Sequence, residues 1–332
     1  MRGLVVREFG PLDSHKIEDL PTPKIGDEDV LIEVHAIGLN FPDTLMLQGK
    51  YQMRPDRPFV PGRDAAGVVR AVGRRVTRCK VGDRVSAQVT WGAFAEQLAA
   101  PQSRVFVLPD DIDFATAAGM VTIYNTAYVA VFVRGNVQPG ETAFITGASG
   151  GVGLAMVELA KARGATVLAG ATSREKADLC KAHGADHWID LSVPDLHEGV
   201  RAQVAKITGE KLCNAVFDVV GGKVFDAAMR CVGYKGRMVI VGFAAMDISM
   251  PKGHHILLKN ISVIGAPLDI HFKMEPELMN RAVAELFELH RKGRIRPEIT
   301  ERFPLERIHE AMNKIASRRA VAKLVLTTRN AA

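Results

Sequence analysis

Residues 147–153, with the sequence GASGGVG, have the composition of a loop that binds phosphate groups. The apolar run 141–146 before them predicts a buried strand, and apolar residues recur at helical spacing over 152–163 after them. A glycine turn in this position brings backbone N–H groups close to a ligand, and the start of the helix favours negative charge. We therefore predict that a dinucleotide pyrophosphate binds at Ser149, Gly150, Gly151 and Val152. The alternative is a tight turn without a ligand.

The residues after the next predicted strand distinguish the two nicotinamide dinucleotides. An NAD site carries an acid about 20 residues beyond the turn, where it binds the ribose 2′-hydroxyl. Hydroxyl and cationic side chains stand here instead: Thr172, Ser173, Arg174 and Lys176. Such donors suit the 2′-phosphate of NADPH, so we predict NADPH as the cofactor, bound more tightly than NADH. The alternative is that Arg174 and Lys176 are ordinary exposed residues in the first turn of a helix, where Glu175 weakens the positive field.

The elements that must position these residues alternate between strand and helix. After the glycine turn we expect strands at 165–171, 187–190, 214–220, 237–242 and 262–265, and helices at 174–183, 202–208 and 225–231. This alternation is typical of a parallel, doubly wound α/β sheet. In such a sheet ligands bind beyond the carboxyl ends of the strands.

The chain before the glycine turn has a different pattern. Short predicted strands at 30–36, 67–73 and 83–87, between glycine, proline and aspartate residues, favour a compact, partly open barrel. We expect two helices next, at 113–120 and 124–133. Near the C-terminus we expect helices at 274–292 and 308–317, and a strand at 322–327 that returns to the first domain.

The composition sets limits on the class of protein. A length of 332 residues favours two domains, and 47% hydrophobic with 24% charged residues is typical of a soluble protein. We find no apolar run of roughly 18 residues and no signal-peptide core, so we expect a cytoplasmic protein without a membrane partner. The net charge of +6 is dispersed, and no base-reading motif accompanies it, which makes nucleic acid an improbable partner. The four cysteines form no C-x-x-C pair, which argues against a disulfide framework and a four-cysteine zinc lobe.

Four segments together resemble the medium-chain dehydrogenase/reductase superfamily. They are GLNFPD at 38–43, PGRDAAG at 61–67, VGDRV at 81–85 and the glycine turn, in matching order across nearly the whole chain. Within the superfamily the chain is similar to the zinc-independent NADPH:quinone oxidoreductases, which are zeta-crystallin-like. The resemblance implies a GroES-like β-barrel catalytic domain, residues 1–122 completed by 267–332, and a Rossmann domain at 123–266.

By the same resemblance, the zinc ligands of the superfamily are replaced. The cysteine of the zinc-dependent branch falls at Asn40, and its Gly-His-Glu falls at Gly62, Arg63 and Asp64. A guanidinium cannot lose its proton to bind a metal. We therefore expect no metal, and we expect hydride delivery to an acceptor that is already electrophilic, such as a quinone or an α,β-unsaturated carbonyl.

The resemblance also suggests the catalytic groups. It places Asn40 beside the nicotinamide, and Tyr51 matches a family tyrosine at the cleft; each could donate a hydrogen bond to the acceptor oxygen. The alternatives are an Asx turn before Pro42 for Asn40 and loop packing for Tyr51. Asp43 is expected to cap the following helix, and Arg63 either pairs with Asp64 or attracts an anionic substrate.

Two later segments occupy ends of predicted strands, and the resemblance implies that both lie near the nicotinamide. The first contains Val241, Gly242, Phe243 and Ala244, and the second contains Gly265, Ala266 and Pro267. Leu191 stands where relatives often carry a tyrosine near the adenosine phosphate. His254 and His255 resemble a metal pair, but neighbours on a strand point apart, so we interpret them as surface or interface residues.

The function predicted is an NADPH-dependent reductase of quinones or α,β-unsaturated carbonyls that uses no metal. Two alternatives remain open: an enoyl-thioester reductase of the acryloyl-CoA type, and an NADPH-binding protein without catalysis. We also expect a homodimer formed through the strand at 261–266, because its apolar edge would otherwise be open to aggregation.

Overall fold

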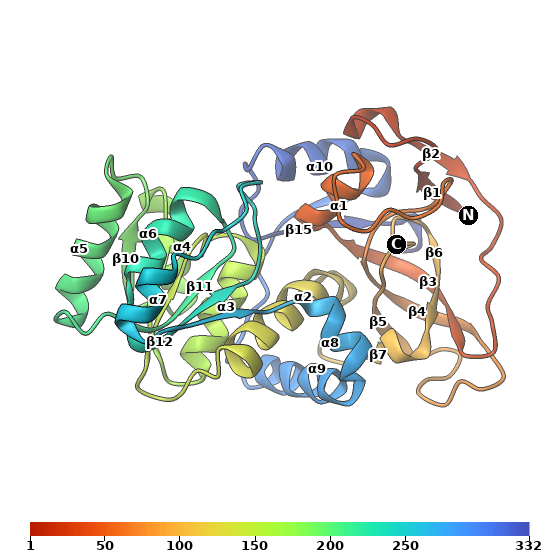
Figure 1. Cartoon of the computed structure of the whole chain (residues 1–332). Helices are drawn as coiled ribbons and strands as arrows, with labels where there is room; N and C mark the ends of the chain where they lie inside the picture. The colour runs from red at the N-terminus through yellow and green to blue at the C-terminus, as the bar shows by residue number, and fades with distance from the viewer. Residues whose placement is uncertain (332) are drawn as a thin grey trace. The chain divides into compact units, whose positions relative to one another are not determined.

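The chain divides into two units in the computed structural model, which describes residues 1–331 (Figure 1). One unit contains residues 1–122 together with the chain from 297, and the other contains residues 123–296. The expectation that 267–332 completes the first unit is therefore wrong for 267–296. Glu285 accepts a hydrogen bond from Tyr128 at 2.6 Å, and the backbone N–H of Arg296 donates to Glu158 at 3.0 Å, so side chains of the second unit hold this segment.

The second unit is built on a six-stranded sheet in which every neighbouring pair is parallel. Its strands are β8 (Thr142–Ile145), β9 (Thr166–Ala171), β10 (His187–Asp190), β11 (Cys213–Asp218), β12 (Val232–Ile240) and β13 (Ser262–Gly265). They lie in the order β10-β9-β8-β11-β12-β13, so the order reverses beside β8, as in a doubly wound dinucleotide-binding sheet. The Rossmann prediction is confirmed.

Helices connect these strands and cover the sheet (Figure 1). They are α3 (Gly151–Ala162), α4 (Arg174–Ala182), α5 (Leu196–Thr208), α6 (Gly222–Arg230) and α7 (Gly253–Lys259). Two further helices, α8 (Leu268–Met274) and α9 (Pro276–Arg291), follow the last strand of the sheet. The single helix expected at 274–292 is wrong at its start: α8 ends at Met274, and Pro276 begins a new helix because its missing N–H is tolerated in a first turn.

His254 and His255 also differ from expectation, because they lie on helix α7 rather than on a strand. Their rings are in contact, with centroids 4.3 Å apart, so the argument that the two side chains point apart is wrong.

A long apolar helix precedes the sheet. Helix α2 (Phe114–Tyr128) runs directly into a π-helical segment, Val129–Arg134, where two separate helices were expected. Residues 114–134 are long and apolar enough to cross a membrane, which corrects the expectation that no segment is. However, 67% of the most apolar window is buried inside the protein, and a core helix passes the same test of length and composition.

The first unit contains a seven-stranded sheet, in which all paired strands are antiparallel except β14 and β15. The strands are β3 (Asp29–Gly38), β4 (Asp64–Val72), β5 (Arg84–Gln88), β6 (Gln97–Pro101), β7 (Val105–Val107), β14 (Ile299–Pro304) and β15 (Lys323–Thr327). Strands β1 (Arg2–Val5) and β2 (Lys16–Asp19) form a separate pair. The unit also contains helices α1 (Phe41–Leu47) and α10 (Ile308–Ala316), the first part of α2, up to residue 122, and four short 3-10 turns, Leu12–Ser14, Gln102–Arg104, Leu305–Arg307 and Arg329–Ala331.

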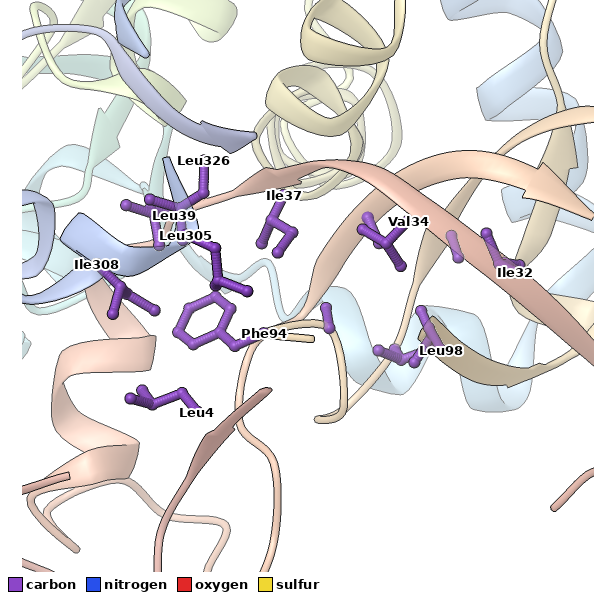
Figure 2. Close-up of a cluster of buried hydrophobic side chains, with 14 of the residues drawn as sticks. Leu4, Ile32, Val34, Ile37, Leu39, Phe94, Leu98, Leu305, Ile308 and Leu326 are labelled. Carbon is purple, nitrogen blue, oxygen red and sulfur yellow. The ribbon is translucent and has the colours of Figure 1, made fainter. Parts of the chain in front are cut away.

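Strand β15 returns to the first unit, as expected from the sequence, and it pairs there with β3, with Val325 opposite Gly38. Figure 2 shows the core beneath this pairing, where β3 contributes alternate residues such as Ile32 and Val34. Leu326 of β15 and Phe94 are fully buried in the same core. Burying a large apolar side chain contributes about 1.5–3 kcal/mol, so this core fixes β15 against β3.

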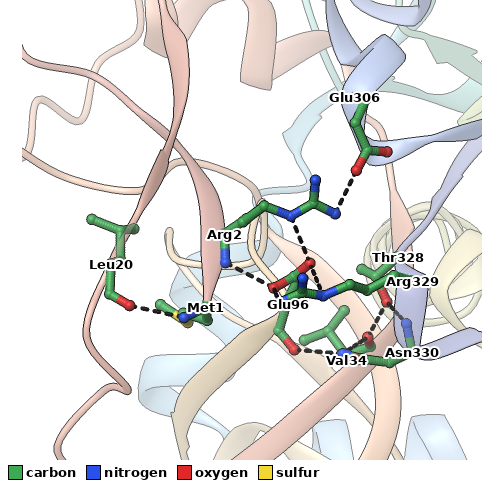
Figure 3. A network of polar contacts seen from close by, with 9 residues as sticks. All are labelled: Met1, Arg2, Leu20, Val34, Glu96, Glu306, Thr328, Arg329 and Asn330. Carbon is green, nitrogen blue, oxygen red and sulfur yellow. Dashed lines mark hydrogen bonds and ion pairs between the residues drawn. The ribbon is translucent and has the colours of Figure 1, made fainter.

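Both ends of the chain are anchored around Glu96 (Figure 3). Its carboxylate accepts hydrogen bonds from the backbone N–H of Arg2 and from the Arg329 guanidinium, each at 2.8 Å. Thr328 and Asn330 donate to the backbone oxygen of Val34 on β3, at 2.5 Å and 3.2 Å. The chain that follows β15 is therefore held beside β3.

Candidate functional site

The residues predicted to bind the cofactor gather at one edge of the parallel sheet. Because all six strands run in the same direction, their carboxyl ends share that edge. The glycine turn follows β8, residues 172–176 follow β9, residues 241–244 follow β12, and residues 265–267 end and follow β13. Segments that are up to 120 residues apart in the sequence are therefore presented on the same side of one unit.

The glycines of the turn differ in the space around them. A Cβ on Gly153 would lie 2.2 Å from the backbone oxygen of Gly147, so a glycine is needed there for α3 to approach the turn. Gly150 is different: its φ is −78°, and a Cβ would meet nothing closer than 3.5 Å. Neither the backbone conformation nor packing requires glycine at 150. The absence of a side chain at 150 leaves the backbone accessible to a ligand such as a pyrophosphate.

Asp218 ends β11 and was not predicted from the sequence. It holds the loop at residues 219–221 against the glycine turn. Its carboxylate accepts hydrogen bonds from the Thr146 hydroxyl at 2.5 Å and from the Gly221 N–H at 2.8 Å. Burial raises the pKa of Asp218, and the bond from Thr146 opposes that rise. Side chains of the loop contact the turn, since a Cβ on Gly147 would lie 2.9 Å from Val219. Asp218 could have been found from the sequence as an acid that ends an apolar strand, shortly before two glycines.

Backbone hydrogen bonds join the loop after β12 to this loop, and join the segment after β13 to the end of β12. Val241 donates to the backbone oxygen of Asp218 at 2.9 Å, and Ala244 donates to that of Val219 at 2.9 Å. Ala266 donates to the oxygen of Ile240 at 3.0 Å. These bonds align the predicted nicotinamide-binding segments along the edge.

The residues predicted to bind the 2′-phosphate lie at the surface around the start of α4. Ser173 caps the helix, and its hydroxyl accepts from the Lys176 N–H at 3.3 Å. The Arg174 guanidinium lies 3.1 Å from the Asp178 carboxylate, so part of its charge is compensated within the helix. Leu191 is buried, and a Cβ on Gly170 would lie 3.0 Å from it, so it serves packing at the end of β9.

The first unit contains a second cluster, centred on the side-chain amide of Asn40. This residue precedes α1, and its backbone N–H donates to the Asp43 carboxylate at 2.8 Å, which confirms Asp43 as a capping residue. The amide nitrogen of Asn40 donates to Asp64 at 2.9 Å, and its amide oxygen accepts from the Lys323 ammonium at 2.6 Å. An Asx turn alone does not account for these two contacts.

All the ionisable groups of this cluster are buried. Asp64 is fully buried, Lys323 is 3% exposed, and their charged atoms lie 3.5 Å apart. Burial raises the pKa of Asp43 to about 7, with the negative charge of Asp64 as the second cause. Burial lowers the pKa of Lys323, which the charges of Asp64 and Asp43 oppose. Lys323 could have been found from the sequence only as a lysine at the start of an apolar strand.

Tyr51 is brought together with Arg63. The guanidinium donates to the Tyr51 phenol oxygen at 3.3 Å, and Arg63 is only 3% exposed. Because a guanidinium donates but does not accept, the phenol oxygen is the acceptor and its proton points away from Arg63. The Tyr51 ring packs on the hydrophobic core of the unit, and the positive charge of Arg63 acts on Asp43.

The cluster contains a cationic side chain, that of Lys323, among its oxygen atoms. Within residues 1–331 no group of three or more His, Cys, Asp and Glu side chains is arranged to hold a metal ion. The Lys323 ammonium lies 2.6 Å from the amide oxygen of Asn40 and 3.5 Å from the Asp64 carboxylate.

Segments of both units match known protein families. Residues 26–110 match the alcohol dehydrogenase GroES-like domain, and residues 151–283 match the zinc-binding dehydrogenase family. A quinone oxidoreductase-like protein 2 homolog of Nematostella vectensis is 34% identical over 99% of this chain and 89% of its own length.

Two solved structures are similar over nearly the whole chain. A mycobacterial protein in complex with NADPH is 30% identical, with a TM-score of 0.92, covering 98% of this chain and 100% of its own. An Escherichia coli quinone oxidoreductase in complex with NADPH is 26% identical, with a TM-score of 0.89 and the same two coverages.

Proposed function

The chain belongs to the quinone oxidoreductase family of medium-chain dehydrogenases/reductases, and from this membership we propose that it is an NADPH-dependent reductase of electrophilic acceptors, namely quinones or α,β-unsaturated carbonyls. The observation that carries the proposal is the open position at Gly150, at the point where the strand order of the parallel sheet reverses. Two similar structures that were solved with NADPH support the choice of cofactor.

NADPH, when bound, supplies the hydride, and this chain's own residues bind and orient the reactants. The backbone at Ser149, Gly150 and Gly151 would hold the pyrophosphate, and Arg174 and Lys176 the 2′-phosphate. In the first unit, Asn40 and Tyr51 would donate hydrogen bonds to the acceptor oxygen. Negative charge develops on that oxygen as the hydride arrives, and fixed donors stabilise such charge.

We propose that the reaction uses no metal. The cluster at Asn40 already contains the Lys323 ammonium within hydrogen-bond distance of the amide oxygen, and a dication beside it would be repelled. A quinone or an enone needs less polarisation than an alcohol, for which zinc normally acts as Lewis acid. Stoichiometric zinc in the purified protein would contradict this part of the proposal.

The acceptor class is tested by anaerobic NADPH oxidation against quinones, alkenals and enoyl-CoA thioesters, with NADH as the control donor. We expect turnover with quinones or alkenals, and weaker binding of NADH. Activity confined to the thioesters would favour an enoyl-thioester reductase. Tight NADPH binding without oxidation by any acceptor would favour a binding protein without catalysis.

The two proposed donors are tested by Asn40→Ala and Tyr51→Phe. Removing a donor to a developing oxyanion typically lowers kcat by about 100- to 1,000-fold. We expect a loss in that direction with an unchanged Kd for NADPH, measured by fluorescence titration. Tyr234→Phe, at an exposed tyrosine of β12, is the matched control. Unchanged kcat in both variants would reject the assigned roles.

We also propose that the protein forms a homodimer through β13. Strand β13 is at the edge of its sheet, and the preceding residues expose large apolar side chains, among them Ile248, Met250, Leu257 and Leu258, each at least 70% exposed. We further propose that the protein is located in the cytoplasm. Cell fractionation tests this location, and recovery of the protein with membranes would contradict it.

A further inference from the structure

We propose that Lys323 is a positioning residue that fixes the orientation of the Asn40 amide, so that one amide N–H remains directed toward the acceptor. The inference rests on the proposed function, which makes Asn40 a hydrogen-bond donor. It deepens that function, because it connects a residue of the last strand with a group 283 positions earlier in the chain.

The contacts of Asn40 permit only one orientation of the amide. Its oxygen lies 2.6 Å from Lys323 Nζ, and its nitrogen lies 2.9 Å from Asp64 Oδ2. An ammonium can only donate a hydrogen bond and a carboxylate can only accept one. Rotating the amide by 180° would set N–H groups against the ammonium and an oxygen against the carboxylate. Repulsion at both ends therefore prevents the rotation.

One N–H of the amide remains after these contacts are made. An asparagine side chain has two N–H donors on its nitrogen, and Asp64 accepts from it through one oxygen. The other Asp64 oxygen accepts from the Thr122 hydroxyl at 2.5 Å, which fixes the carboxylate in turn. The second N–H of Asn40 is then held in a defined direction, as a donor to a developing negative charge must be.

Strand pairing brings Lys323 to this position. Strands β15 and β3 are antiparallel, with Val325 opposite Gly38. The same register continues beyond the strand end, because the N–H of Leu39 donates to the oxygen of Leu324 at 3.2 Å. One further step sets Lys323 opposite Asn40. The anchoring of Thr328 and Asn330 to the Val34 oxygen (Figure 3) keeps β15 in this register.

A double-mutant cycle tests the proposal through kcat for the best acceptor. Lys323→Met keeps the length of the side chain but removes the charge and the donors. If Lys323 acts through Asn40, Lys323→Met lowers kcat by about 10- to 100-fold in the wild type and by less than about twofold in the Asn40→Ala background. Lys323→Arg, which retains a donor and the charge, restores part of the rate. The KM for NADPH stays constant throughout.

The matched control is Lys314→Met, which removes the ion pair with Glu301 in the same unit. It is expected to leave kcat unchanged and shows the effect of losing a lysine pair alone. Equal losses of kcat from Lys323→Met in the two backgrounds would overturn the proposal, because Lys323 would then act independently of Asn40.

A second measurement keeps the inference separate from the proposed function. With ¹⁵N-labelled asparagine, the two side-chain N–H signals of Asn40 are assigned by their loss in Asn40→Ala. In Lys323→Met, at a temperature where the fold is intact, these signals should shift and exchange faster with solvent. Unchanged signals would overturn the positioning role. Shifted signals with an unaffected kcat in Asn40→Ala would support the positioning role and reject Asn40 as the catalytic donor.

Discussion

Asp43 is a buried carboxyl group whose protonation changes near neutral pH. Its pKa is raised to about 7 by burial and by Asp64, against the opposing charges of Arg63 and Lys323. Because the pKa in the folded state lies above that in the unfolded state, the folded protein binds more protons between about pH 4 and 7. The free energy of unfolding contributed by this group therefore falls as the pH rises through that range.

Asp43→Asn removes this titration and keeps an oxygen to accept from the Asn40 N–H. We expect the free energy of unfolding of the variant to depend less on pH than that of the wild type, by about 1.4 kcal/mol for each unit of pKa shift. Urea denaturation at several values between pH 5 and 8 measures the difference. Asp19→Asn, at an exposed position of β2, serves as the control. Parallel pH profiles for wild type and Asp43→Asn would contradict the prediction.

At the scale of single residues, the sequence identified groups within a motif but not their partners from distant segments. Asn40 and Tyr51 were found through a resemblance, and Asp43 through its position at a helix start. Lys323 and Asp218 were missed, since their roles depend on strand pairing and on the order of strands in a sheet. Hydrogen bonds of this kind exist only once the fold has brought the segments together.

The glycine turn after β8 supports a prediction at the scale of an element. A Cβ on Gly153 would overlap the backbone of Gly147, so Gly153→Ala should lower the melting temperature as well as NADPH affinity. In Gly150→Ala the added methyl group enters open space when no ligand is bound, so the melting temperature should remain that of the wild type. Its affinity for NADPH should still fall by at least about tenfold, because the methyl group occupies the space of the pyrophosphate.

Differential scanning fluorimetry without ligand and fluorescence titration with NADPH separate the two effects. Gly140→Ala is a control for glycine replacement in the same unit: nothing lies within 4 Å of its Cβ, although its φ of +82° gives a small general loss of stability. Undiminished NADPH binding by Gly150→Ala would show that the ligand does not approach the turn there.

Elements were predictable where the pattern was long or carried a specific signal. The period of apolar residues identified the strands of the parallel sheet, and β10 and β13 match the expected bounds. The break between α8 and α9 had a visible cause in Pro276. The seven-residue helix α7 did not, because a short segment with an apolar stretch at 256–258 suits a strand equally well.

Over the whole chain, the point near residue 296 where the second unit ends and the first resumes could not be predicted from the sequence. Residues 267–296 follow the last strand of the parallel sheet and were assigned by their order in the chain. Their assignment depends on contacts instead: Glu158, buried on α3, accepts hydrogen bonds from the Tyr124 phenol at 2.5 Å and from the Arg296 N–H. Tyr124 and Arg296 lie near the first and last residues of the second unit, so one buried carboxylate fixes both of its ends.

Assembly of the whole molecule is tested at helix α7, which immediately precedes the edge strand β13. Leu257 and Leu258 are 80% and 79% exposed there. Lysine at both positions would place two positive charges on each facing surface of a two-fold interface. We therefore expect the double variant Leu257→Lys, Leu258→Lys to be monomeric at concentrations where the wild type is a dimer in light scattering. Val81→Lys, at an exposed apolar residue of the other unit, should remain dimeric. A monomeric wild type, or a double variant that still dimerises, would show that this surface is not the interface.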